Sequence, residues 1–167
     1  SEFTKNTVVL VFGTILAQAI PLILHPFLRD IYSVEDFGAM AVFLSVFSMV
    51  TIVSALRYEA TIVLPENDIE SANILSLTFV INLCINSIAF IVILFFKQNI
   101  VGLIGLPQKY ANFLFLLPIT SFLFSFYQSL NYWLIKQKAF KASSTNKIVR
   151  RVFEGTFQLV LGLLKVP

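Results

Sequence analysis

Residues 74–96 read ILSLTFVINLCINSIAFIVILFF, a run that contains no Lys, Arg, Asp or Glu. An α-helix of about 20 apolar residues crosses the roughly 30 Å of hydrocarbon in a lipid bilayer. Residues 8–28, 37–56 and 110–135 are also free of charge and long enough for such a crossing. The sequence therefore predicts an all-α fold, a polytopic bundle of transmembrane helices.

The composition excludes a soluble domain. Hydrophobic residues make up 57% of the chain and charged residues only 13%, and the mean hydropathy is +0.86. Soluble domains carry roughly 25% charged residues. So few charges cannot cover a surface that faces water.

A fifth apolar stretch covers residues 148–164, with Arg150, Arg151 and Glu154 in its first turns. We therefore expect about five spans within one bundle over residues 4–167. Ser1-Glu2-Phe3 lacks an initiator Met and is interpreted as a cloning remnant. Five spans leave the two ends on opposite sides of the membrane, so we expect an incomplete bundle.

Two connections carry signals for the start of a helix. Ser33 followed by Asp36, and Asn67 followed by Glu70, pair a capping side chain with an acid three residues later. Prolines at positions 21, 26 and 118 are expected as kinks inside the first and fourth spans.

Basic residues near the span ends predict the orientation, because cytoplasmic loops of membrane proteins are enriched in Lys and Arg. With a cytoplasmic N-terminus, eight basic residues fall inside and four outside, which favours that orientation. The eight are Lys5, Arg57, Lys136, Lys138, Lys141, Lys147, Arg150 and Arg151, and the four are Arg29, Lys97, Lys109 and Lys165.

Polar residues recur at helical spacing along every span. They are Thr14, Gln18, His25 and Arg29 in the first; Ser48, Thr51, Ser54 and Tyr58 in the second; Thr78, Asn82 and Asn86 in the third; Ser121, Ser125, Gln128 and Tyr132 in the fourth; and Arg150, Glu154 and Gln158 in the fifth. Such stripes either line a hydrated cavity or form hydrogen bonds between packed helices, each worth about 0.6 kcal/mol. Because five spans share the pattern, we favour a common cavity.

Individual residues allow simpler interpretations as well. His25 is the only histidine and fits a local polar contact. Arg29 and Arg57 lie at span ends, where long side chains extend to the lipid head groups. Arg150 and Glu154 can form an ion pair at i and i+4. Cys84 is the only cysteine and is interpreted as an apolar residue.

No catalytic constellation, metal-ligand cluster or cofactor motif is present in the sequence. We therefore expect a protein that is not an enzyme, with no metal, no cofactor and no nucleic-acid partner.

Three segments carry a resemblance to a known family. Residues 21–38, PLILHPFLRDIYSVEDFG, resemble the first helix and loop of bacterial polysaccharide flippases. Residues 56–65, LRYEATIVLP, and residues 128–141, QSLNYWLIKQKAFK, are similar to the ends of the second and fourth helices of that family. The chain thus resembles the N-terminal part of a Wzx-type O-antigen or capsule flippase, in the multidrug/oligosaccharidyl-lipid/polysaccharide exporter superfamily.

The resemblance implies two six-helix bundles around a central cavity in the bacterial inner membrane. Alternating access would carry an oligosaccharide linked to polyprenyl pyrophosphate between the leaflets, for O-antigen or capsule biosynthesis, with membrane lipids and other polysaccharide-assembly proteins as partners. On this sequence the implied substrate-binding residues are Arg29, Arg57, Tyr58 and Glu59, with Arg150. The polar stripes add Gln18, His25, Asn82 and Gln128.

Three alternatives remain open. An ion-coupled multidrug exporter of the same superfamily would carry buried acids in its first helices, and the first four spans have none. A non-transporting membrane scaffold would close its polar stripes into dry helix contacts. An enzyme acting on polyprenols would need acidic residues in its loops.

Overall fold

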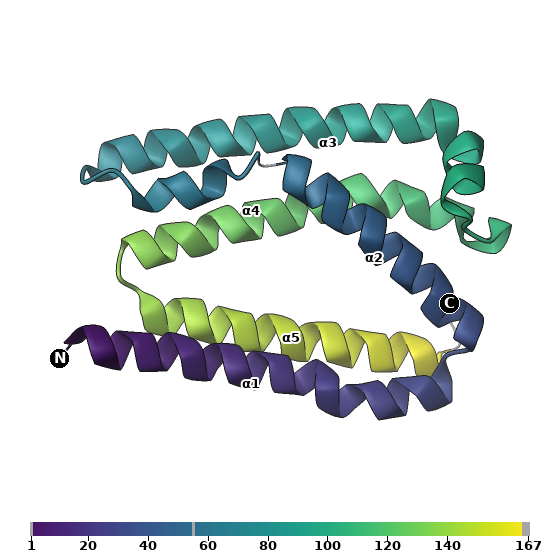
Figure 1. Cartoon of the computed structure of the whole chain (residues 1–167), viewed down its shortest axis with the longest axis horizontal. Coiled ribbons are helices and arrows are strands. Elements are labelled where there is room, and N and C mark those ends of the chain that lie inside the picture. Colours follow the sequence, from purple (N-terminus) through teal and green to yellow (C-terminus); the bar gives the residue numbers. More distant parts are fainter. Residues whose placement is uncertain (1, 55, 165–167) are drawn as a thin grey trace. The chain divides into compact units, whose positions relative to one another are not determined.

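The computed structural model describes residues 2–54 and 56–164, and within these ranges the chain contains helices and no strand. The elements are α1 (Glu2–Ile31), α2 (Val34–Ser54), the 3-10 helix η1 (Tyr58–Val63), α3 (Asp68–Ile104), the 3-10 helix η2 (Gln108–Phe115), α4 (Leu116–Lys136) and α5 (Phe140–Leu163). Figure 1 shows the order of the elements along the chain. The expected all-α class is confirmed.

Four stretches of the described residues are long and apolar enough to cross a membrane. They are 8–31, 34–54, 68–104 and 108–136. The chain is therefore a multi-pass membrane protein. It divides into two compact units, one formed by residues 1–37 with 137–167 and the other by residues 38–136.

The first unit is a pair of parallel helices, α1 and α5, which run in the same direction (Figure 1). Ser144, near the start of α5, donates a hydrogen bond to the Val9 carbonyl near the start of α1 at 3.1 Å. At the other end, Gly162 lies against Ile31 and Tyr32. The two helices thus stay in contact from one end of the apolar α1 span to the other.

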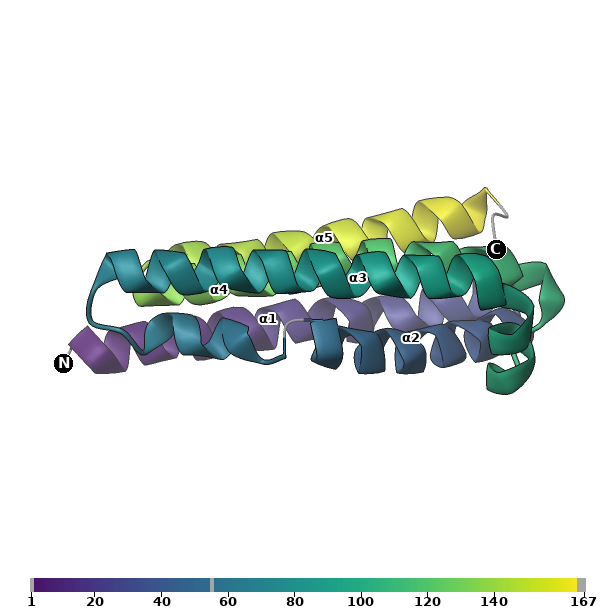
Figure 2. The ribbon, with the colours of Figure 1, turned by 90° about the horizontal axis from the view of Figure 1, so that it is seen from above.

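The second unit contains α3 and α4 as antiparallel neighbours, with η1 packed against both. Figure 2 shows η1 alongside the first half of α3. Ile62 of η1 is completely buried, and Leu114 and Leu117 at the junction of η2 and α4 are each 1% exposed. Leu114 and Leu117 belong to a core that apolar residues of α2 and of the second half of α3 complete.

Both predicted helix starts are present. The Ser33 backbone N–H donates to the Asp36 carboxylate at 2.9 Å, and the Asp36 N–H donates to the Ser33 hydroxyl at 3.2 Å. At the start of α3 the Asn67 side chain accepts from the Ile69 N–H at 2.9 Å. Each bond satisfies an amide that has no partner inside the helix.

The second span ends earlier than the sequence predicts. The helix stops at Ser54 rather than Leu56, because Leu56 and Arg57 adopt left-handed backbone conformations with φ of 47° and 60°. Two successive non-glycine residues in this region are unfavourable and persist only where the surrounding packing holds them. The chain continues directly after the break into η1, whose Ile62 is completely buried.

The third helix is longer than predicted, because it begins at Asp68 and continues past Phe96 to Ile104. The backbone leaves helical geometry at Phe96 (φ −116°, ψ 16°) without ending the element. Gly105, with φ of 66°, ends it in the left-handed conformation that glycine adopts at low cost. Residues 100–104 therefore belong to α3.

The predicted fourth span, residues 110–135, divides into η2 and α4. Pro118 is the third residue of α4 and not a kink inside a long helix. A proline is tolerated in a first turn because amides there have no helical acceptor. Pro21 and Pro26, in contrast, do lie inside α1.

Candidate functional site

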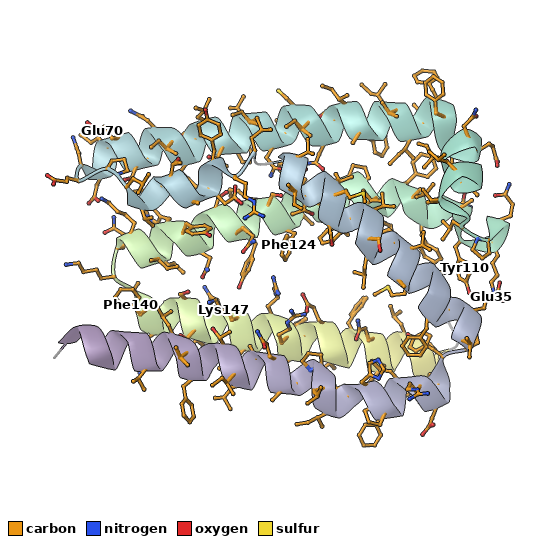
Figure 3. All side chains as sticks on the ribbon, viewed as in Figure 1. Glu35, Glu70, Tyr110, Phe124, Phe140 and Lys147 are labelled. Carbon is orange, nitrogen blue, oxygen red and sulfur yellow. The ribbon has the colours of Figure 1, made fainter. Side chains whose placement is uncertain are left out.

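Three charged side chains form one cluster on α5. Arg150 Nε lies 3.2 Å from Glu154 Oε1, and Arg151 Nη1 lies 2.9 Å from Glu154 Oε2. The ion pair between Arg150 and Glu154 was expected from their spacing and is confirmed. Lys147, which Figure 3 labels, lies one turn earlier on the same helix.

The contacts between α1 and α5 show at which level along the length of α1 this cluster lies. A β-carbon on Gly13 would meet Ser144, and a β-carbon on Gly155 would meet Leu24. Arg150, Arg151 and Glu154 lie between Ser144 and Gly155 in the sequence, so they stand between the heights of Gly13 and Leu24. These heights are in the middle of the apolar α1 stretch, residues 8–31. The three charges therefore lie at the level of the middle of the apolar α1 stretch. The predicted fifth span, residues 148–164, is not among the four described stretches that are long and apolar enough to cross a membrane.

Helical periodicity places the polar residues of α1 on the same side as this cluster. At about 100° per residue, the side chains of Gln18 and His25 are rotated by about 120° around the α1 axis from the line along which α1 contacts α5. The side chains of Arg150 and Glu154 are rotated by about 110° in the opposite sense, around the α5 axis, from the line along which α5 contacts α1. On two parallel helices that face one another, opposite rotations point to the same side. Just beyond α1, the Tyr32 hydroxyl donates to the Gln158 backbone carbonyl of α5 at 2.8 Å.

We call this side of the first unit the polar surface, and define it by the residues Gln18, His25, Arg150 and Glu154. Gln18 and His25 are exposed, and the His25 ring lies 5.7 Å from the Phe37 ring. Arg29, in the last turn of α1, is exposed and lies near the edge of the surface.

The opposite side of the same helix pair is apolar and exposed. It is formed by Phe12, Ile23, Phe27, Val149, Val152 and Leu163. In a bilayer this side suits contact with acyl chains, whereas ionised side chains at the same depth face protein or water. The first unit therefore has a lipid side and a polar side.

In the second unit the polar stripes meet inside helix contacts. Asn82 and Asn86 of α3 are 1% and 4% exposed. The Asn82 amide donates to the Phe122 carbonyl of α4 at 3.0 Å, and the Asn86 amide donates to Ser54 Oγ of α2 at 3.0 Å. Ser54 and Ser121 join α2 to α4 through their hydroxyls at 3.0 Å.

These bonds form a directed network. The Ser54 hydroxyl donates to the Val50 carbonyl at 2.7 Å, so its oxygen is left to accept from Asn86 and Ser121. The Asn86 amide nitrogen also reaches Asn82 Oδ1 at 2.7 Å. For this stripe the structure therefore has the helix–helix hydrogen bonds that were the alternative interpretation, although Asn86 also lines a pocket with Ser87 and Pro118. Gln128, further along α4, is half-buried.

The segment from Arg57 to Glu59 lies at the break between α2 and η1. Arg57 is exposed, and Tyr58 is 43% exposed. Glu59 Oε2 is buried and has no hydrogen-bond partner among the described residues. The structure therefore groups the predicted site residues in two sets. Gln18, His25, Arg29 and Arg150 belong to the first unit, and Arg57, Tyr58, Glu59, Asn82 and Gln128 belong to the second.

Arg151 was not among the predicted site residues, although its position three residues before Glu154 also fits an ion pair on one helix face. Within the part of the chain that the structure describes, no group of three His, Cys, Asp or Glu residues is placed to hold a metal ion.

Comparison with known proteins gives one match. A family model described as "Polysaccharide biosynthesis protein" matches residues 28–166, which is more than four fifths of the chain. The match runs from the end of α1 through α5. No curated protein and no solved structure matched the chain.

Proposed function

The chain belongs to the polysaccharide biosynthesis protein family, and on that premise we propose that it forms part of a flippase. The flippase would carry an oligosaccharide linked to polyprenyl pyrophosphate across the bacterial inner membrane, by alternating access, for O-antigen or capsule synthesis. In this proposal the N-terminus is cytoplasmic, and the protein transports its substrate without chemical change.

The observation that supports this proposal most strongly is the charge at membrane depth on the polar surface. Ionised groups in the membrane interior are expensive and mark substrate or ion pathways. Arg150 and Arg151 together outnumber Glu154, so the cluster carries a net positive charge. Guanidinium groups bind phosphate oxygens through paired N–H donors. A cationic wall of this kind suits the pyrophosphate of a lipid-linked sugar.

The remaining predicted residues complete the proposed path. Gln18 and His25 would offer hydrogen bonds beside the cationic cluster. Arg29 and Arg57 would receive the head group from the ends of their helices, and Tyr58 and Glu59 would contact the sugar. Asn82 and Gln128 would act through the packing of α3 and α4.

Transport can be measured with the full-length protein in liposomes that contain a lipid-linked oligosaccharide with a labelled sugar. A membrane-impermeant oxidant that destroys the label reports the amount of sugar in the outer leaflet. Arg150→Gln and Arg151→Gln should each slow translocation about tenfold or more, because a hydrogen bond to a charged group contributes about 1.5–3 kcal/mol. Lys141→Gln, a neutralisation in the first turn of the same helix, should leave the rate unchanged. Equal rates for all three variants and the unmodified protein would contradict the proposal.

A non-transporting scaffold is the alternative that the contacts of Asn82, Asn86 and Ser54 favour, because those polar groups are already paired. The hydration of the polar surface separates the two functions. In a background with Cys84→Ser, Gln18→Cys should react with a membrane-impermeant thiol reagent, whereas Ile23→Cys on the lipid side should not. Protection of both cysteines would favour the scaffold.

A further inference from the structure

Glu154 contacts two arginines at once. Its Oε1 lies 3.2 Å from Arg150 Nε, within ion-pair distance, and its Oε2 accepts a hydrogen bond from Arg151 Nη1 at 2.9 Å. Both arginines are more than half buried along their side chains, at 26% and 38% exposure. The carboxylate reduces the net charge of the cluster from two positive charges to one.

The position of the cluster makes this neutralisation important. The three side chains stand between the heights of Gly13 and Leu24 on α1, in the middle of an apolar span. Two unpaired cations at this depth would be costly. A ligand oxyanion would be attracted by the same two guanidinium charges that Glu154 partly neutralises, so the carboxylate and the ligand compete for them.

We propose that Glu154 is an internal counter-ion of the polar surface. It holds both arginines while the surface is empty, and it gives up at least one of them to a phosphate or pyrophosphate oxyanion on binding. When the oxyanion leaves, Glu154 takes the donor back. The inference rests on the proposed function, and it assigns to Glu154 the role of limiting the affinity so that the ligand can be released.

The ordinary explanation is that Glu154 only stabilises α5. Ion pairs at i, i+3 and i, i+4 on a helix surface do so weakly. The two explanations predict opposite effects on binding. A structural acid, once neutralised, should weaken ligand binding together with stability, whereas a competing acid should strengthen binding and slow release.

Binding can be measured on the full-length protein in detergent with farnesyl pyrophosphate as the probe and farnesol as the uncharged reference. Glu154→Gln keeps the size and hydrogen-bonding capacity of the side chain and removes its charge. We expect this variant to bind farnesyl pyrophosphate about tenfold more tightly and to release it more slowly, since a hydrogen bond to a charged group is worth a factor of about ten or more. Arg151→Gln should weaken binding by a similar factor.

Glu66→Gln, in the exposed connection before α3, is the matched control and should change neither binding nor release. The thermal unfolding temperature of each variant shows whether a change in binding comes from a less stable fold or from the loss of competition between Glu154 and the ligand. In the liposome assay Glu154→Gln should lower the maximal translocation rate although it binds the probe more tightly.

Two failures are distinguishable. If the arginine variants weaken binding of farnesyl pyrophosphate but Glu154→Gln also weakens it or leaves it unchanged, the counter-ion role is wrong and the proposed function stands. If the unmodified protein binds farnesyl pyrophosphate no better than farnesol, the anion site itself is wrong, and the counter-ion role fails with it.

Discussion

A β-carbon placed on Gly13 would stand 2.6 Å from the β-carbon of Ser144, closer than two such atoms can approach. The backbone of α1 therefore lies directly on a side chain of α5 at this height. One turn earlier on α1, the Val9 carbonyl accepts the Ser144 hydroxyl at 3.1 Å. Small residues permit this close approach, and packing of this kind drives association between membrane helices.

Gly13→Ala should therefore loosen the first unit. We expect a loss of about 1–3 kcal/mol in the free energy of unfolding, the usual cost of forcing a methyl group into a filled contact. Denaturation of the purified protein in detergent measures this loss. Gly38→Ala is the control, because a β-carbon there meets nothing within 4 Å. Adding Ser144→Gly to Gly13→Ala should restore part of the stability, and a double variant no better than Gly13→Ala would contradict the contact.

The network of Asn86, Ser54 and Ser121 should couple the stabilities of α2, α3 and α4. Asn86→Ala and Ser54→Ala should each destabilise the protein, and a double-mutant cycle should give a coupling of about 0.6–1.7 kcal/mol, the range for hydrogen bonds between membrane helices. Unfolding measurements on the four variants provide the cycle. Asn73→Ala, on the exposed side of α3, should have a small effect, and strict additivity of the two network variants would argue against the bond.

Tyr32 should make the contact between α1 and α5 sensitive to alkaline pH. Burial raises the pKa of Tyr32 above its ordinary value of 10.0, and the nearby Asp36 carboxylate raises it further. The unfolded chain then loses the phenol proton first, so the stability contributed by Tyr32 is complete below pH 10 and falls as the pH rises above it.

Tyr32→Phe removes the bond to the Gln158 carbonyl, and should cost about 0.5–1.5 kcal/mol at neutral pH. The stabilities of the unmodified protein and this variant should converge as the pH rises above 10. Thermal unfolding of both proteins between pH 8 and 11 tests this, and a difference that stays constant would show that the phenol does not titrate in the contact.

The sequence predicted the helices and their starts because both depend on local chemistry. Four of the five predicted apolar runs lie in stretches long and apolar enough to cross a membrane, and Ser33, Asp36 and Asn67 made the caps that their spacing indicated. The early end of α2 was not predictable. Leu56 and Arg57 are residue types that rarely adopt a left-handed backbone, and nothing in their spacing indicates that they do so here.

Only part of the candidate site could be predicted from the sequence, because the site also depends on which elements pack together. Helical spacing identifies which residues share a face, but it does not identify the element that this face meets. Asn82 and Asn86 share a face as expected, and they bond to Phe122, Ser54 and each other. The five-span topology implied that the first and fifth helices run in the same direction, but spacing alone could not show that α5 packs directly on α1 through Ser144 and Gly162.

The two prolines within α1 have a mechanical consequence. Pro21 and Pro26 have no N–H, so the carbonyls of Ala17 and Leu22 lack their usual donors along the helix. The turns between residues 17 and 26 are then softer against bending than the rest of α1, and they lie at the same height as the Arg150–Glu154 pair. A change in curvature of α1 would start beside the charged cluster, and would alter how far Gln18 stands from the arginines while the ends of the helix keep their contacts with Ser144 and Gly162.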